Sequence, residues 1–286
     1  VVVNVETINK GFVFSDWYRG SSFENNQRKY QLKVPNEITL TAKFAQDVTA
    51  IEKIRVLNVY PYSGSNLKTW METNGYGKVN NKPIIQVTSV SIGSFPGSHS
   101  IDNYDVVVFG FWDCNSSTDM SNAGANWMDK WVAAKKPVIF GHDTLEGALI
   151  CGYHNNFNRY SSYVGLDTSS YPRRTEWEST GNTSSSVKIT KDSTFTKYPW
   201  NIGDAGKILY IPTSHDLGQK VINTDNIFLT FTSQSRASTK ADNFYLVVNG
   251  TGAMIQTGHS SGAATVDEQK ILANLIFYLY SQYVIH

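Results

Sequence analysis

Short apolar runs that alternate with helix-type segments are the feature that most constrains the fold of this chain. Such runs occupy residues 54–60, 84–92, 105–113 and 136–142, and helical periodicity at residues 121–134 separates the last two. Strands that are apolar on both faces are typical of parallel sheets, whose neighbouring strands need a crossover connection. We therefore expect an α/β fold with a doubly wound, mostly parallel sheet.

The flanking segments follow other patterns. Residues 1–50 form an N-terminal β segment, in which alternation at 29–35 and 38–44 predicts a β-hairpin. The α/β domain then spans residues 51–286. Between about 165 and 245 the pattern changes to short strand-like runs, which predict a β-rich insertion lying over the carboxyl edge of the sheet.

Two patterns place the last elements of the chain. Asn249-Gly250 between two apolar runs predicts a hairpin turn. Thr265 and Glu268 match a capping box, in which each side chain satisfies a backbone N–H of the other residue. A C-terminal helix with a buried leucine and isoleucine stripe is expected to start there.

Composition excludes some classes of function. The net charge is +1 and the basic residues are scattered, so the chain lacks the basic stripe of a nucleic-acid-binding protein. No run approaches the ~18 apolar residues of a membrane span. Only 17% of the residues are charged, and the abundance of Ser, Thr, Asn and Tyr favours an extracellular or cell-surface location.

Two of the apolar runs end in Gly-His, at His142 and His259. Carboxyl ends of parallel strands meet at one edge of the sheet, so these imidazoles should share a crevice there. Asp143 and Asp113 also follow strands, and the insertion can bring His215 to the same place. Imidazoles with a carboxylate suit a zinc-like ion, while the alternative is that they only hydrogen-bond the turns.

Cys114 and Cys151 follow the third and fourth apolar runs. If those strand ends are close, we expect the two cysteines to form a disulfide. The alternative is that both are buried thiols. Five aromatic residues could form a carbohydrate-stacking platform near the crevice, although ordinary packing is the alternative: Trp112, Tyr171, Trp177, Tyr198 and Trp200.

The apolar runs that end at residues 113, 142 and 259 resemble strands of the class I glutamine amidotransferase-like superfamily, near its trehalose-utilisation-type branch. That superfamily has a flavodoxin-like fold. Residues 137–142 resemble the strand that ends at the nucleophilic Cys, where this chain has His142. Residues 254–259 resemble the last strand and place His259 at the triad His, but the triad Glu is replaced by Ser261. A glutaminase needs the thiolate and the carboxylate, so the resemblance implies a catalytic triad that is not retained.

A closer resemblance, over residues 54–280, is to an uncharacterised domain of large secreted or cell-surface proteins. It is carried by residues 104–113, 141–144, 198–203, 254–262 and 267–270.

The leading expectation is a non-enzymatic extracellular or surface module that serves adhesion, assembly or ligand binding. Its partners would be other surface proteins, further copies of itself or a carbohydrate, with no cofactor, bound metal, nucleic acid or membrane insertion. A ligand would contact His142, Asp143, His215 and His259. The alternative is a metal-assisted hydrolase that acts on carbohydrate and uses His142, His259 and Asp113.

Overall fold

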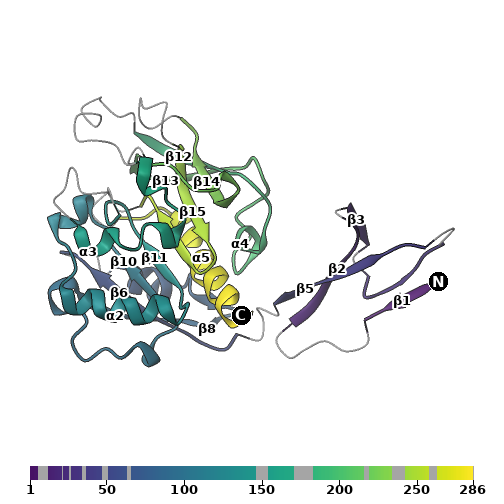
Figure 1. Cartoon of the computed structure of the whole chain (residues 1–286), viewed down its shortest axis with the longest axis horizontal. Helices are drawn as coiled ribbons and strands as arrows, with labels where there is room; N and C mark the ends of the chain where they lie inside the picture. Colours follow the sequence, from purple (N-terminus) through teal and green to yellow (C-terminus); the bar gives the residue numbers. More distant parts are fainter. Residues whose placement is uncertain are drawn as a thin grey trace. The chain divides into compact units, whose positions relative to one another are not determined.

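The computed structural model describes residues 1–5, 12–20, 22–25, 27–33, 37–46, 51–62, 66–145, 154–170, 183–215, 219–233, 242–257 and 263–285. These residues form two compact units, Val1–Glu52 and Lys53–Val284 (Figure 1). Each unit is described by itself. No helix among the described residues is long and apolar enough to cross a membrane.

The N-terminal unit is built from two small antiparallel sheets. The expected hairpin of residues 29–35 with 38–44 is wrong, because β4 pairs with β1 while β5 pairs with β2. The reason is the aromatic strand β2, whose Phe14 ring meets Phe44 of β5 edge to face. The strands are β1 (Val2–Asn4), β2 (Phe12–Arg19), β3 (Ser22–Asn25), β4 (Lys29–Gln31) and β5 (Leu40–Gln46).

One half of the nine-stranded sheet in the larger unit is parallel. Its strands lie in the order β9-β6-β10-β11-β16. Counted along the chain, this is the order 2-1-3-4-5 of a doubly wound, flavodoxin-like sheet, so the expected fold class is confirmed. The strands are β6 (Ile54–Tyr60), β9 (Ile85–Ser91), β10 (Val106–Phe109), β11 (Val138–Phe140) and β16 (Gly252–Ile255).

The other half of the sheet is antiparallel and continues from β16 through β15, β14 and β12 to β13. The expected insertion therefore does not lie over the carboxyl edge but widens the sheet. The hairpin of β15 with β16 explains this, because it leaves the far side of β15 free to pair with β14. The strands are β12 (Ser184–Ile189), β13 (Ile208–Ser214), β14 (Ile227–Phe231) and β15 (Phe244–Asn249).

Helices cover both faces of the sheet. On one face, Trp127, Met128 and Trp131 of α2 share a buried cluster with Val107, Phe109, Val138 and Phe140. Successive strand residues point to opposite faces, and Tyr245, next to Phe244 of that cluster, donates to Glu268 of α5 on the other face. The helices are α1 (Asn66–Lys68), continued by the π-helical turn Thr69–Thr73, with α2 (Asn122–Ala133), α3 (Asn155–Asn158), α4 (Thr194–Lys197) and α5 (Val266–Ile285).

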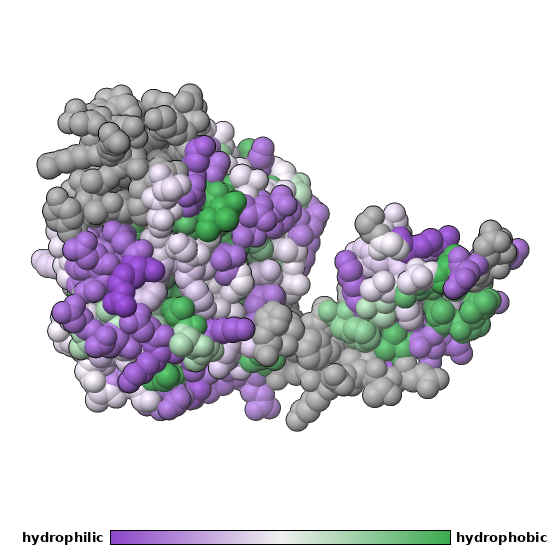
Figure 2. Space-filling model, viewed as in Figure 1, coloured by the Kyte–Doolittle hydropathy of each residue, from purple (hydrophilic) through white to green (hydrophobic). Residues whose placement is uncertain are grey.

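Short elements complete the larger unit. Its surface in the view of Figure 2 has several separate hydrophobic patches between hydrophilic areas. Exposed large apolar side chains of this unit include Ile208, Ile222 and Val266. The short elements are β7 (Lys78–Val79), β8 (Lys82–Pro83) and 3₁₀ turns at Ile92–Ser94, Ile101–Asn103, Ser162–Val164, Thr168–Ser170 and Thr224–Asn226.

Side chains bond the outer backbone groups of both edge strands. At β9, the Val87 N–H donates to the Glu72 carboxylate at 2.8 Å. At β13, the Tyr210 N–H donates to Asp267 at 2.9 Å, and the Thr265 hydroxyl donates to the Tyr210 carbonyl at 2.6 Å. The residues that start α5 thus also fix the strand at the end of the sheet.

Candidate functional site

The candidate site lies at the carboxyl edge of the parallel strands. His142 follows β11 after one glycine, Gly141. That glycine is required because an added Cβ would lie 3.0 Å from the Phe109 carbonyl oxygen and the Phe111 nitrogen. The ends of β10 and β11 therefore touch through their backbones, which brings the residues after both strands together.

The His142 side chain is fully buried. Its Nδ1 lies 2.9 Å from Gln256 Oε1, and its Nε2 lies 3.3 Å from Asp143 Oδ2. The His215 ring packs against it edge to face, with the ring centroids 4.8 Å apart. The structure thus brings together His142, Asp143 and His215 of the expected set, while His259 lies outside the described residues.

The backbone around Asp143 is strained. Asp143 itself has a φ of 61°, and Cys114 to Ser117 form four consecutive left-handed residues with φ between 43° and 53°. For L-residues this conformation costs about 1–2 kcal/mol each, so other contacts must hold it. One such contact is the Cys114 N–H, which donates to Asp143 Oδ2 at 2.7 Å.

This turn also explains why β10 is shorter than expected. The apolar run reaches Asp113, but the strand ends at Phe109 because Gly110 (φ 98°) and Phe111 (φ 75°) leave the extended conformation. The chain then enters the turn Asp113–Ser117.

Asp113, Cys114 and Asp143 form the one group among the described residues with the spacing of a metal site, their ligand atoms lying within 4.8 Å of one another. However, Cys114 is disulfide-bonded, and its sulfur is therefore not a thiolate ligand. Two carboxylates remain, fewer than the 6–8 oxygens around calcium. Cys151, the other cysteine of the chain, lies outside the described residues.

Sequence reasoning missed a buried polar network beside His142. Both ends of the Gln256 amide have a partner. Its Nε2 donates to Gln219 Oε1 at 3.5 Å, and its Oε1 faces His142 Nδ1. Ser214 donates to the Gln256 carbonyl. All four side chains are buried. The signal was a glutamine inside the apolar run that ends at His259, because a buried amide needs partners.

Glu268 is a buried titratable group that accepts a hydrogen bond from Thr257, the residue after Gln256. Thr265 accepts from the Glu268 N–H at 3.1 Å, as in a capping box, but the carboxylate instead accepts from Tyr245 and Thr257. Its second oxygen, Oε2, has no hydrogen-bond partner among the described residues. Complete burial raises the pKa of Glu268 to about 7.

A second buried imidazole also faces this turn. His154 Nδ1 lies 2.9 Å from the Asp143 carbonyl oxygen. Burial lowers the pKa of His154, so its ring is neutral at pH 7 and donates to that carbonyl.

An aromatic pair, the exposed Tyr62 and the half-buried Trp112, follows β6 and β10, the two strands between which the chain order reverses. The ring centroids of Tyr62 and Trp112 are 5.3 Å apart, and Tyr62 is 70% exposed. The rest of the expected platform does not join them. Tyr198 packs on Phe277 of α5 and Trp200 on Tyr76, while Tyr171 and Trp177 lie outside the described residues.

Replacing His142 by alanine should lower the free energy of unfolding by about 2 kcal/mol, because Gln256 and Asp143 lose a buried partner. Urea denaturation of wild type and variant measures this difference. His99→Ala is the control, since His99 is only partly buried and bonds Tyr104 near the surface. Equal stability of the His142 variant and wild type would contradict a structural role for this imidazole.

Neither a protein-family model nor a curated protein matches the sequence. Several solved structures resemble the chain, and three of them are described here. A putative ThuA-like protein from Bacteroides uniformis is 11% identical, with 79% of this chain and 91% of that chain covered and a TM-score of 0.50. A putative ThuA-like protein from Parabacteroides merdae is 13% identical over 80% and 90%, with a TM-score of 0.47.

The third, the structure of PurLQS from Thermotoga maritima, is 14% identical over 79% of this chain and 99% of that chain, with a TM-score of 0.42. Of these three, the Bacteroides uniformis structure reaches a TM-score of 0.50, and at 11% identity it shows the fold alone. Together with the strand order, it shows that the larger unit has a flavodoxin-like fold.

Proposed function

We propose that this chain is a non-enzymatic binding module with an amidotransferase-like core. The observation that carries the proposal is the state of His142, which resembles the nucleophile in position but is fully buried and bonded to Gln256. A nucleophile or a catalytic base must reach its substrate. A side chain enclosed in this way holds the turn instead.

The other groups of an amidotransferase triad are replaced. Ser261 is at the position of the Glu that orients the triad His, and it lies outside the described residues together with His259. Cys114 does not substitute for the missing thiolate, because it is disulfide-bonded. The catalytic triad of the superfamily is therefore not retained in this proposal, and glutamine is not a substrate.

The module works outside the cell or on its surface. Disulfides persist in oxidising compartments and are rare in the cytosol, so the bond at Cys114 supports this location. In such a place the module serves adhesion, assembly or ligand binding, as the closer resemblance to secreted domains implies.

The ligand-binding face is the carboxyl edge around Tyr62 and Trp112. Open α/β sheets bind ligands where the strand order reverses, and this pair follows the two strands at that point. Aromatic faces of this kind stack on the apolar faces of sugar rings, which favours a carbohydrate as the ligand. The nearby Asp113 carboxylate would repel a phosphate group, which disfavours a phosphate-bearing ligand.

The alternative, a metal-assisted hydrolase that acts on carbohydrate, is favoured by the closeness of Asp113 and Asp143. It requires His142 as a metal ligand, yet His142 Nδ1 already faces Gln256 and its Nε2 faces Asp143. We therefore place the hydrolase second.

The proposal predicts that the purified protein releases no ammonia from glutamine and that EDTA leaves its melting temperature unchanged. A bound ion would stabilise only the native state, so its removal would lower the melting temperature. Both are measured on wild type and on Asp113→Asn, which removes one of the two close carboxylates.

A chelator-dependent fall of several degrees that Asp113→Asn abolishes would support the hydrolase instead. Ammonia release that is lost in His142→Ala would refute the binding module outright.

A further inference from the structure

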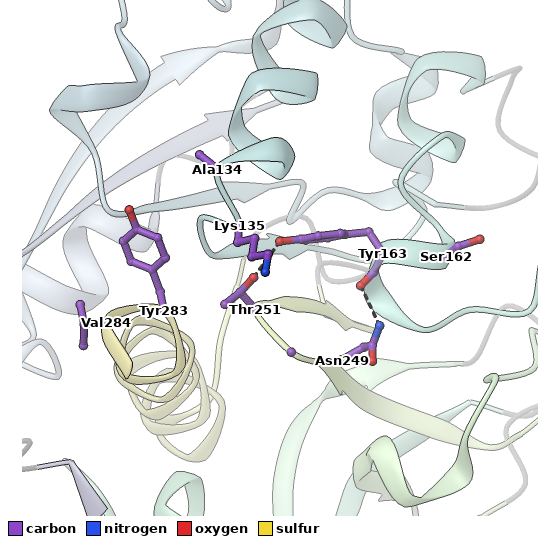
Figure 3. A pocket seen from close by; sticks show the side chains of 9 residues that line it. Ala134, Lys135, Ser162, Tyr163, Asn249, Thr251, Tyr283 and Val284 are labelled. Atoms are coloured by element: carbon purple, nitrogen blue, oxygen red, sulfur yellow. Dashed lines mark hydrogen bonds between the residues drawn. The ribbon is translucent and has the colours of Figure 1, made fainter. Parts of the chain in front are cut away.

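A cavity of about 820 Å³ opens at the opposite end of the parallel strands from His142. It lies where β11 and β16 begin, whereas His142 follows the end of β11. Its volume is that of small-molecule sites, roughly 300–1,000 Å³. The lining residues come from the end of α2, the turn at Ser162–Val164, the β15–β16 turn and the end of α5 (Figure 3): Ala134, Lys135, Ser162, Tyr163, Asn249, Gly250, Thr251, Tyr283 and Val284.

One positively charged side chain lines this cavity. Among the described residues, Lys135 is the one charged residue of the lining, and it makes no ion pair there. The negative end of the α2 dipole is weakened, because the N–H groups of Ala134, Lys135 and Lys136 bond the last carbonyls of the helix. An anionic group is therefore the charge complement of Lys135.

Two tyrosine rings flank the cavity. Figure 3 shows Tyr283 on one side and Tyr163 on the other, with Lys135 and Thr251 between them. The Tyr163 hydroxyl lies 2.7 Å from Thr251 Oγ1, and the Asn249 side chain donates to the Tyr163 carbonyl at 3.1 Å.

The Tyr163 ring also rests directly on the backbone of β16. A Cβ added at Gly252 would lie 2.8 Å from this ring. The wall is thus fixed before a ligand arrives, which lowers the entropic cost of binding.

We propose that this cavity binds a small carboxylate that carries a ring, with the carboxylate at Lys135 and the ring between Tyr163 and Tyr283. An acidic sugar and an aromatic acid share this chemistry, because both combine an anionic group with a ring face that tyrosine contacts. The site is separate from the carboxyl edge and does not depend on the function proposed there.

The test is a calorimetric or NMR titration of the whole protein with glucuronate and with 4-hydroxybenzoate. Glucose and 4-hydroxybenzyl alcohol are the neutral counterparts. A ligand of about a dozen non-hydrogen atoms should reach a dissociation constant of about 1 mM, so the titrations extend to about 10 mM. At least one carboxylate should saturate, and its neutral counterpart should bind about fivefold more weakly. The carboxylate that binds more tightly shows whether the ligand is an acidic sugar or an aromatic acid.

Variants separate the two contributions. Lys135→Gln should weaken carboxylate binding about fivefold, while Lys130→Gln, exposed on the same helix outside the cavity, should not. Tyr283→Ala should remove measurable binding and Tyr283→Phe should retain it, because the ring supplies the contact. Circular dichroism confirms that each variant is folded.

Failure of both carboxylates to saturate would overturn the proposal, as would wild-type affinity in Lys135→Gln. His142→Ala should bind the same carboxylate as wild type does. The outcome here is therefore distinct from any failure of the proposed function at the carboxyl edge.

Discussion

Replacing Glu268 by glutamine should make the protein about 3 kcal/mol more stable at pH 8 while leaving it little changed near pH 4. Burial raises the pKa of Glu268 from 4.5 to about 7 in the folded protein. The folded state then holds a proton that the unfolded chain has already released. The contribution of Glu268 to stability is therefore complete below pH 4.5, and it is lost as the pH rises through 7.

Glutamine imitates the protonated carboxyl, because its oxygen still accepts from Tyr245 and Thr257. The measurement is urea denaturation from pH 4 to pH 8 for wild type, Glu268→Gln and Asp267→Asn. Asp267 is the neighbouring carboxyl and is only partly buried, so its variant should follow the wild-type pH dependence. If the pH dependence of the wild-type stability between pH 5 and pH 8 were the same in Glu268→Gln, the raised pKa of Glu268 would be contradicted.

Loss of the disulfide at Cys114 should also have a large effect. We expect Cys114→Ser to lower the free energy of unfolding by about 3 kcal/mol, the usual size for a native disulfide. The left-handed turn from Cys114 to Ser117 makes the position sensitive, since strained backbone persists only where its surroundings hold it.

Denaturation with and without dithiothreitol measures the effect. The reductant should destabilise wild type to the level of Cys114→Ser and leave that variant unaffected. Ser117→Ala changes the same turn but keeps the disulfide, so it should respond to the reductant as wild type does. A wild-type protein that is indifferent to the reductant would contradict a stabilising bond.

The parallel core could be predicted from the sequence because its evidence is local. The run at residues 54–60 is β6, and the hairpin expected at Asn249-Gly250 is present, with Gly250 and Thr251 as the turn between β15 and β16. Both patterns depend on neighbours within a few residues.

Pairing partners and side-chain roles were harder to predict because they depend on distant residues. The strand at Lys29–Gln31 pairs with Val2–Asn4 rather than with its sequence neighbour. Glu268 matches a capping box, yet its carboxylate accepts from Tyr245, more than twenty residues earlier. Residue spacing contains no information on such a partner, which the packing of α5 on β15 brings into reach.

The bonds at the outer strands restrict how this module can meet a partner. A sheet edge recruits another chain through its unpaired N–H and C=O groups, the basis of both β-augmentation and aggregation. Here Glu72 occupies the Val87 N–H, while Asp267 and Thr265 occupy both backbone groups of Tyr210. Pro212 removes a further donor from the same strand. These bonds and Pro212 leave fewer free backbone groups on β9 and β13 for a strand of another chain to pair with.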